Sequence, residues 1–178
     1  SGSAYVYVRN GDQWVEQAKL TAADGASNDF FGMSVSISGE TAIVGAHRDD
    51  DNGNDSGSAY VYVRNGDQWV EQAKLRGSGY SSGFGSSVSI SGETAIVGAP
   101  GNSDSAHIFA REVGSWTLQE TIWSPDGYSE GAGNFGYSVS VDGNTTIVGT
   151  QGSSAYVYFF NGSKWLFLNK LTASDGAP

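Results

Sequence analysis

Apolar and polar residues alternate along much of this chain. Around Val35 and Ile37, the apolar side chains are separated by serines, and a period of two residues is typical of a β-strand with one buried face. The pattern predicts short strands near residues 32–38 and 41–46, joined by a turn at Gly39.

A second alternating pattern predicts another hairpin. In the segment SGSAYVYVRNGDQWVEQAKL, we expect strands near residues 3–9 and 14–20 with a turn at Asn10-Gly11. Asn-Gly is a strong hairpin signal because both central residues of the favoured two-residue turn need a positive φ. Two such hairpins in succession predict an all-β fold.

Both hairpins are repeated. Residues 1–20 return unchanged at 56–75, and SVSISGETAIVGA at 34–46 returns unchanged at 87–99. A unit of this size cannot bury its own apolar face, so the copies must stack on one another. We therefore predict one β-propeller-type array of four-stranded antiparallel blades over residues 1–178, with a half-blade at 1–20 and blades at 30–75, 84–122 and 135–171.

The lengths of the connections predict a binding face. The turns inside each hairpin are nearly constant, whereas the segments that join one hairpin to the next vary. In an up-and-down sheet all of these variable connections lie at the same end, and insertions gathered on one face often mark a binding surface. The alternative is that this end merely tolerates insertions.

Composition excludes several classes of partner. The net charge is −10 and there is no cysteine. Nucleic acids and anionic lipid surfaces need a basic footprint, and thiolate metal sites need cysteine, so none of these is expected. No apolar run is long enough to insert into a membrane.

One acidic loop is a candidate calcium site. The segment HRDDDNGNDSG carries Asp49, Asp51, Asn54 and Asp55, and Ca²⁺ binds six to eight oxygens from carboxylates, amides and carbonyls. The alternative is a solvated acidic turn. The spacing is not that of an EF-hand loop.

Aromatic residues give a candidate glycan site. The tyrosines that recur in register, such as Tyr5, are expected in the core, with a sugar-stacking platform on an open edge as the alternative, and the register tryptophans, such as Trp14, are also expected in the core. Trp123 falls outside the register, in a predicted loop over residues 123–134 that also holds Tyr128, and this pair is the candidate ligand site. The two histidines have no catalytic neighbours in the sequence, so no enzyme activity is expected. Asn-x-Ser/Thr sequons at Asn54, Asn144 and Asn161 are candidate glycosylation sites.

The spacing of glycines resembles a known repeat. Phe84-Gly85 is followed, thirteen residues from glycine to glycine, by Gly98-Ala99-Pro100. The same motif recurs at residues 31–46, where His47 follows in the place of the proline, and in a weaker form at residues 135–150. The chain resembles the FG-GAP repeats of integrin α-subunit β-propellers, and more closely the tandem FG-GAP arrays of bacterial and algal surface proteins.

This resemblance implies four-stranded blades around an axis, in secreted or surface-exposed proteins that serve adhesion, ligand binding or matrix building. The family's calcium loop, DxDxDGxxD, is absent from the short turns at 38–41, 91–94 and 142–145, so that site is not transferred to this chain.

We therefore expect a non-catalytic structural or adhesive module, located outside the cell or on its surface. A lectin-like propeller and an accessory propeller of a larger secreted enzyme are the alternatives. Fourteen strands make three and a half blades and leave open edges, so the expected partners are other protein chains, a longer parent chain, or glycans.

Overall fold

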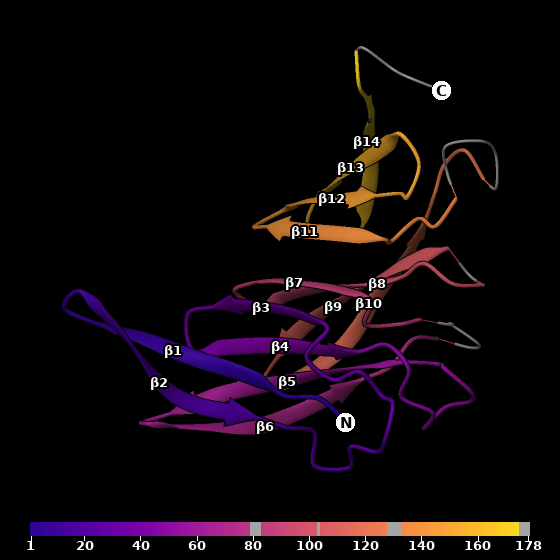
Figure 1. Ribbon diagram of the computed structural model, residues 1–178. Coiled ribbons are helices and arrows are strands. Elements are labelled where there is room, and N and C mark those ends of the chain that lie inside the picture. Colours follow the sequence, from indigo (N-terminus) through magenta and orange to yellow (C-terminus); the bar gives the residue numbers. More distant parts are fainter. Residues whose placement is uncertain (79–82, 103, 128–132, 175–178) are drawn as a thin grey trace.

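A computed structural model describes residues 1–78, 83–102, 104–127 and 133–174, and its regular secondary structure consists of fourteen β-strands (Figure 1). They form one two-stranded and three four-stranded antiparallel sheets, which confirms the predicted all-β, propeller-type array. We call these sheets the half-blade and blades 1 to 3.

Within each sheet the strands pair in chain order. The half-blade comprises β1 (Ala4–Asn10) and β2 (Gln13–Leu20). Blade 1 comprises β3 (Ser34–Ser38), β4 (Thr41–Ala46), β5 (Ser58–Asn65) and β6 (Gln68–Leu75). Blade 2 comprises β7 (Ser87–Ser91), β8 (Thr94–Ala99), β9 (Ser105–Glu112) and β10 (Ser115–Trp123). Blade 3 comprises β11 (Ser138–Asp142), β12 (Thr145–Gly149), β13 (Ser154–Phe160) and β14 (Trp165–Thr172).

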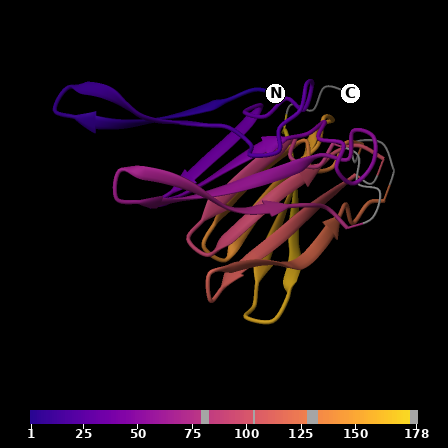
Figure 2. The same cartoon turned by 90° about the horizontal axis from the view of Figure 1, so that it is seen from below.

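The sheets are arranged as an open fan. The first strands of successive blades, β3, β7 and β11, pack against one another, while the outer strands diverge (Figure 1). The half-blade lies at one end of the fan and blade 3 at the other, so the array does not close. Figure 2 shows the long connections on one side of the fan and the short hairpin turns on the opposite side, as the connection lengths predicted.

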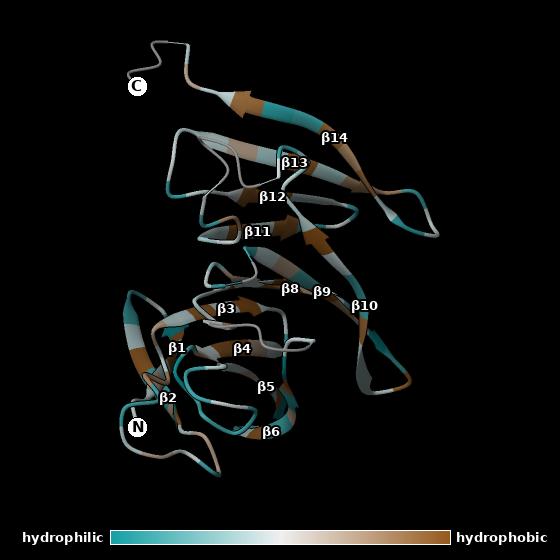
Figure 3. Cartoon of the chain, turned by 90° about the vertical axis from the view of Figure 1, so that its right-hand side faces the viewer, coloured by the Kyte–Doolittle hydropathy of each residue, from teal (hydrophilic) through white to brown (hydrophobic). Residues whose placement is uncertain are grey.

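Three apolar clusters hold the array together, one at each junction between neighbouring sheets. Each contains one phenylalanine of a Phe-Gly pair, namely Phe31, Phe84 or Phe135, and all three are buried. In Figure 3 the strands carry alternating hydrophobic and hydrophilic residues, whereas the connections are mostly hydrophilic or neutral. The period-two pattern therefore places apolar side chains between sheets, and each sheet depends on its neighbours for burial.

Glycines of the repeated motif meet across the junctions. A Cβ on Gly45 would lie 2.0 Å from the carbonyl oxygen of Gly85, and a Cβ on Gly98 would lie 2.0 Å from that of Gly136. No side chain fits at either position, because the backbones of neighbouring blades are in contact. The motif thus marks the place where one blade rests on the next.

The prediction that the register aromatics are buried fails for the half-blade. Tyr60 is fully buried in blade 1, but Tyr5, which has the same sequence neighbours, is 48% exposed. Trp14 is likewise 69% exposed, whereas Trp165 is buried in blade 3. The physical reason is that no sheet covers the outer face of β1 and β2.

Candidate functional site

The same β-bulge recurs in every outer hairpin. In the pair β1–β2, Val6 lies opposite Ala18 and Tyr7 opposite Glu16, so Gln17 has no cross-strand partner. The register shifts at the same place in the other three hairpins. The unpaired residues there are Gln72, Gln119 and Leu168. A bulge redirects its extra side chain away from the ladder.

The bulged glutamines bind the next blade. Each accepts a hydrogen bond at Oε1 from the indole Nε1–H of the following register tryptophan. The pairs are Trp69 with Gln17 at 2.9 Å, Trp116 with Gln72 at 3.0 Å and Trp165 with Gln119 at 3.0 Å. Blade 3 has Leu168 in the place of glutamine, so it offers no equivalent acceptor to a further tryptophan.

The serines of the first strand form a second set of links between blades. The Oγ of Ser36 accepts a hydrogen bond from the backbone N–H of Ile90 at 3.2 Å, and that of Ser38 accepts one from Gly92 at 3.1 Å. Ser34 donates its hydroxyl to the carbonyl of Gly85 at 2.7 Å. The corresponding serines of blade 2, Ser87, Ser89 and Ser91, bind blade 3 in the same way.

An ion cluster around the Lys74 ammonium lies at the end of the fan where the long connections gather, with Asp49 buried, Lys74 mostly buried, and Asp24 and Asp51 exposed. The Lys74 ammonium contacts the carboxylates of Asp24 at 2.7 Å and Asp49 at 2.9 Å, and also that of Asp51. The Tyr60 hydroxyl donates to Asp24 or Asp49, each at 2.8 Å. Because Asp24 belongs to the connection that precedes blade 1, the cluster ties the half-blade to blade 1.

The charges of this cluster shift one another's pKa values. Hydrogen bonds from Lys74 and then Arg76 lower the pKa of Asp51. Burial acts to raise the pKa of Asp24, but hydrogen bonds from Lys74 and Tyr60 outweigh it and lower that pKa. Burial, followed by the two neighbouring carboxylates, raises the pKa of Tyr60. Burial acts to lower the pKa of Lys74, but its hydrogen bonds to the three aspartates outweigh burial and raise that pKa, so Lys74 is a cation.

The calcium candidates do not converge on a common point other than Lys74. Asp49 and Asp51 meet at its ammonium, whereas the Asp55 carboxylate accepts a hydrogen bond from the Asn54 amide at 3.3 Å. In the part of the chain that the structure describes, no three His, Asp or Glu side chains are arranged to hold a metal ion. Calcium binding by this loop stays a prediction.

Blade 2 replaces the tyrosine of the cluster with His107. Its ring contacts the hydroxyls of Ser105 at 3.2 Å and Thr121 at 3.1 Å, and its edge meets the Phe84 ring. Burial lowers the pKa of His107 to about 4, so the imidazole is neutral near pH 7. This residue packs the junction between blades 1 and 2 through the Phe84 ring.

The other predicted site residues lie at exposed positions. Trp123 is the last residue of β10 rather than part of a loop, and it is 58% exposed. Tyr128 lies outside the described residues. The sequon residues Asn54, Asn144 and Asn161 are all exposed. Their use as glycan or glycosylation sites stays a prediction.

Sequence reasoning missed the residues that join the blades. The sixteen-residue step from Ala4 to Leu20, which recurs from Ala59 to Leu75, held the signal, because these residues pair across the hairpin and the bulge adds one residue to the step. Gln17 and Lys74 look like ordinary solvent-facing residues of an amphipathic strand. Only the bulge and the neighbouring loop reveal their partners.

The junctions define an open, propeller-type repeat array. A family model described as the FG-GAP repeat matches residues 14–62 and 69–109, together just over half of the chain. The chain therefore belongs to the FG-GAP repeat family, as the glycine spacing indicated. No curated protein sequence matches it.

Solved structures share the fold. The Saccharomyces cerevisiae protein Sqt1 superimposes with a TM-score of 0.58 at 14% identity, over 83% of this chain and 37% of that one. A functionally unknown protein from Desulfotomaculum acetoxidans DSM 771 gives a TM-score of 0.60 at 16% identity, over 90% of this chain and 46% of that one. This chain spans less than half of either protein, and the likeness concerns the fold alone.

A search of the described residues for a helix with the length and hydrophobicity of a membrane span finds none.

Proposed function

We propose that this chain is a non-catalytic structural module of an extracellular or cell-surface assembly. One observation carries the proposal: the same links recur from junction to junction. The glutamine link is present at all three junctions, and the links through serine and the Phe-Gly backbone are present at both junctions between complete blades. Such a unit extends by addition of further copies, which suits a building block or a rigid support that presents a ligand. FG-GAP repeat domains are generally non-catalytic and typically occur in extracellular proteins, which also supports the proposal.

Surface exposure tests this function directly. Antibodies against the chain should label intact, unpermeabilised cells or their extracellular matrix, and the protein should be recovered in the corresponding fraction. Exclusive recovery from the cell interior would contradict the proposed role. Hydrolysis or transfer of a substrate by the purified chain would contradict the non-catalytic part.

A lectin-like role is the second candidate, and the exposed indole of Trp123 favours it. Exposed aromatic rings provide the flat apolar surface on which sugar rings stack. Binding to a glycan array should be lost in Trp123→Ala and retained in Val113→Ala, which changes an exposed residue at the opposite, hairpin-turn end of blade 2. If the unaltered chain binds no glycan, the lectin role is excluded.

Calcium binding has its own test. A cation that binds only the folded chain raises the melting temperature, and the rise grows with the logarithm of its concentration relative to Kd. The calcium prediction requires a higher melting temperature in millimolar Ca²⁺ than in chelator. Equal melting temperatures would exclude the calcium site, and the contacts of Lys74 with Asp49 and Asp51 would then be the sole role of these two carboxylates.

A further inference from the structure

Two pairs of identical segments in this chain differ in burial, and the difference locates an incomplete surface. Val88 and Ile90 of β7 are only 7% and 5% exposed. Their counterparts in β3, Val35 and Ile37, are 60% and 56% exposed, although residues 34–46 and 87–99 have the same sequence. The environment alone accounts for this contrast, so something that covers β7 is missing over β3.

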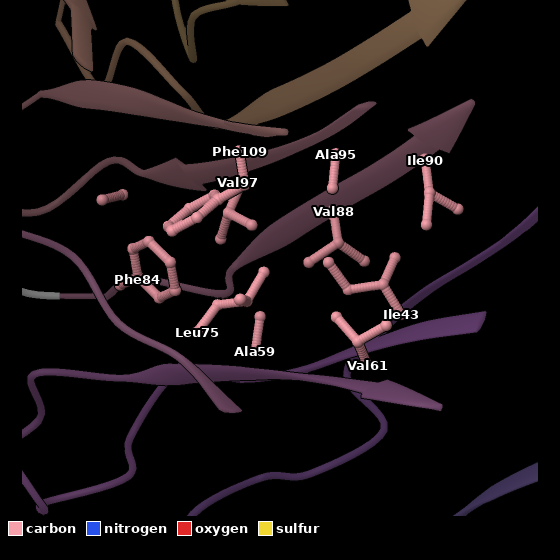
Figure 4. Close-up of a cluster of buried hydrophobic side chains, with 11 residues drawn as sticks. Ile43, Ala59, Val61, Leu75, Phe84, Val88, Ile90, Ala95, Val97 and Phe109 are labelled. Carbon is pink, nitrogen blue, oxygen red and sulfur yellow. The ribbon is translucent and has the colours of Figure 1, made fainter. Parts of the chain in front are cut away.

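The missing cover can be identified at the complete junction. Figure 4 shows Val88 and Ile90 packed towards Ile43 and Val61 of blade 1. Val61 belongs to β5 and has an equivalent in the half-blade, Val6, which is buried against blade 1. Ile43 belongs to β4, and the half-blade has no strand of that kind. The cover that β3 lacks is therefore the first hairpin of a blade.

The edge of β1 is open in the same place. β5 has the sequence of β1 and pairs with β4 on one side and β6 on the other. Among the strands of the described residues, β1 pairs with β2 alone, so its second edge presents unpaired backbone groups, which favour the addition of a further strand. A hollow of about 450 Å³ lies between β1, β3 and β4, and its lining includes Val6, Leu20, Val35 and Ile37.

The backbone N–H groups on β3 and in the turn after it also favour the first hairpin of a blade as the missing cover. In blade 2 the N–H groups of Ile90, in β7, and of Gly92, in the turn after β7, donate to the serine hydroxyls of the preceding first strand. The equivalent N–H groups of blade 1 belong to Ile37, in β3, and Gly39, in the turn after β3, and no serine of the described residues takes that position there. An incoming strand with the Ser-x-Ser-x-Ser pattern would supply these acceptors.

We propose that the open edge of β1 and the exposed face of β3 form a docking site for one β-hairpin of the β3–β4 type, supplied by another FG-GAP repeat. The hairpin adds its second strand to β1 by antiparallel pairing. Its isoleucine, in the place of Ile43, fills the hollow over Val35 and Ile37, and its serines accept the free N–H groups of β3. This inference rests on the proposed function, because it names the element through which the array extends.

The repeat provides the test molecule. Since residues 1–20 repeat 56–75, a chain that carries a copy of residues 30–55 ahead of Ser1 presents the hairpin through a connection that already exists in blade 1. The control is the same extended chain with Ile43→Asp in the added copy only. Amide hydrogen exchange of β1, Ile37 and Gly39 is measured in the original and in both extended chains.

We expect the N–H groups of Ile37 and Gly39, and those of β1 that point away from β2, to exchange at least about tenfold more slowly in the extended chain, and the control to lose this protection. Unchanged exchange, with blades 1 to 3 still protected, would overturn the proposal. So would protection in the original chain that grows with protein concentration, because the hairpins of this type in a second copy are already paired within its own blades, and a different element would then occupy the site. Neither result would alter labelling of the native protein on intact cells, so failure of this inference is distinguishable from failure of the proposed function.

Discussion

Replacement of Lys74 by methionine tests whether the ion cluster joins the half-blade to blade 1. Lys74 and Asp49 have side chains that are only 10% and 4% exposed, so the variant leaves a buried carboxylate without its cation. Removal of one partner of a buried pair costs about 3–5 kcal/mol. We expect the lower end of that range, because Asp49 still accepts hydrogen bonds from Ser58, Tyr60 and the Asp51 amide.

Lys19 provides a matched control. It has the same sequence neighbours but lies on the uncovered half-blade, where its ammonium faces the exposed Tyr5 ring at 5.7 Å. Lys19→Met and Lys74→Met change the net charge equally. A cation–π interaction at an exposed site contributes about 0.5 kcal/mol. Lys74→Met should therefore lower the free energy of unfolding by about 2.5 kcal/mol more than Lys19→Met does.

The assay is urea unfolding followed by tryptophan fluorescence, supported by thermal melting. For a chain of this length a loss of about 3 kcal/mol lowers the melting temperature by about 6–12 °C. Addition of Asp49→Asn to Lys74→Met should restore about 1 kcal/mol, since it removes the unpaired charge. Equal effects of the two lysine variants, or a loss below about 1 kcal/mol for Lys74→Met, would refute the reasoning.

Three further predictions concern single positions. His107 has its pKa lowered by burial from 6.5 to about 4, so the folded chain resists the proton that the unfolded chain binds. The free energy of unfolding should therefore be highest above pH 6.5 and fall by about 3 kcal/mol between pH 6.5 and 4. If the same fall with pH persists in His107→Gln, other groups cause it. Val113 has φ +49° where other copies have glycine, so Val113→Gly should add about 1 kcal/mol, measured by urea unfolding; a loss of stability would show that this turn carries no strain. Ser89→Ala removes the acceptor of the Val141 N–H and should cost about 1 kcal/mol in the same assay, whereas Ser140→Ala at the open end should cost little; similar costs would contradict the role of the serine links.

The repeats and their alternation were sufficient to predict the fold. The exact repeats of residues 1–20 and 34–46 predicted the four-stranded units, and the variable connections were placed at one end because the strands run up and down. These inferences succeeded because each depends on local sequence and on the requirement that every unit bury one face.

The ion cluster could not be predicted in the same way. Lys74 has the same local sequence as Lys19, yet only Lys74 meets Asp24 and Asp49, which come from two different connections. The reading of Asp49 and Asp51 as calcium ligands considered the loop by itself and did not include the lysine from β6. The prediction that Tyr5 is buried was wrong for a related reason. A side chain on this strand is buried only where a neighbouring sheet covers it, and the strand's own sequence does not show whether that sheet is present.

Residue-resolved hydrogen exchange in the unaltered chain tests the central claim most directly. Residues 4–8 and 59–63 have the same sequence, but β1 has one neighbouring strand and an uncovered face, whereas β5 has two neighbours and a sheet on each side. If mutual support between sheets determines stability, the amides of β5 should exchange at least about tenfold more slowly than those of β1. Equal protection of the two identical strands would show that each hairpin is stable by itself, and would contradict the account.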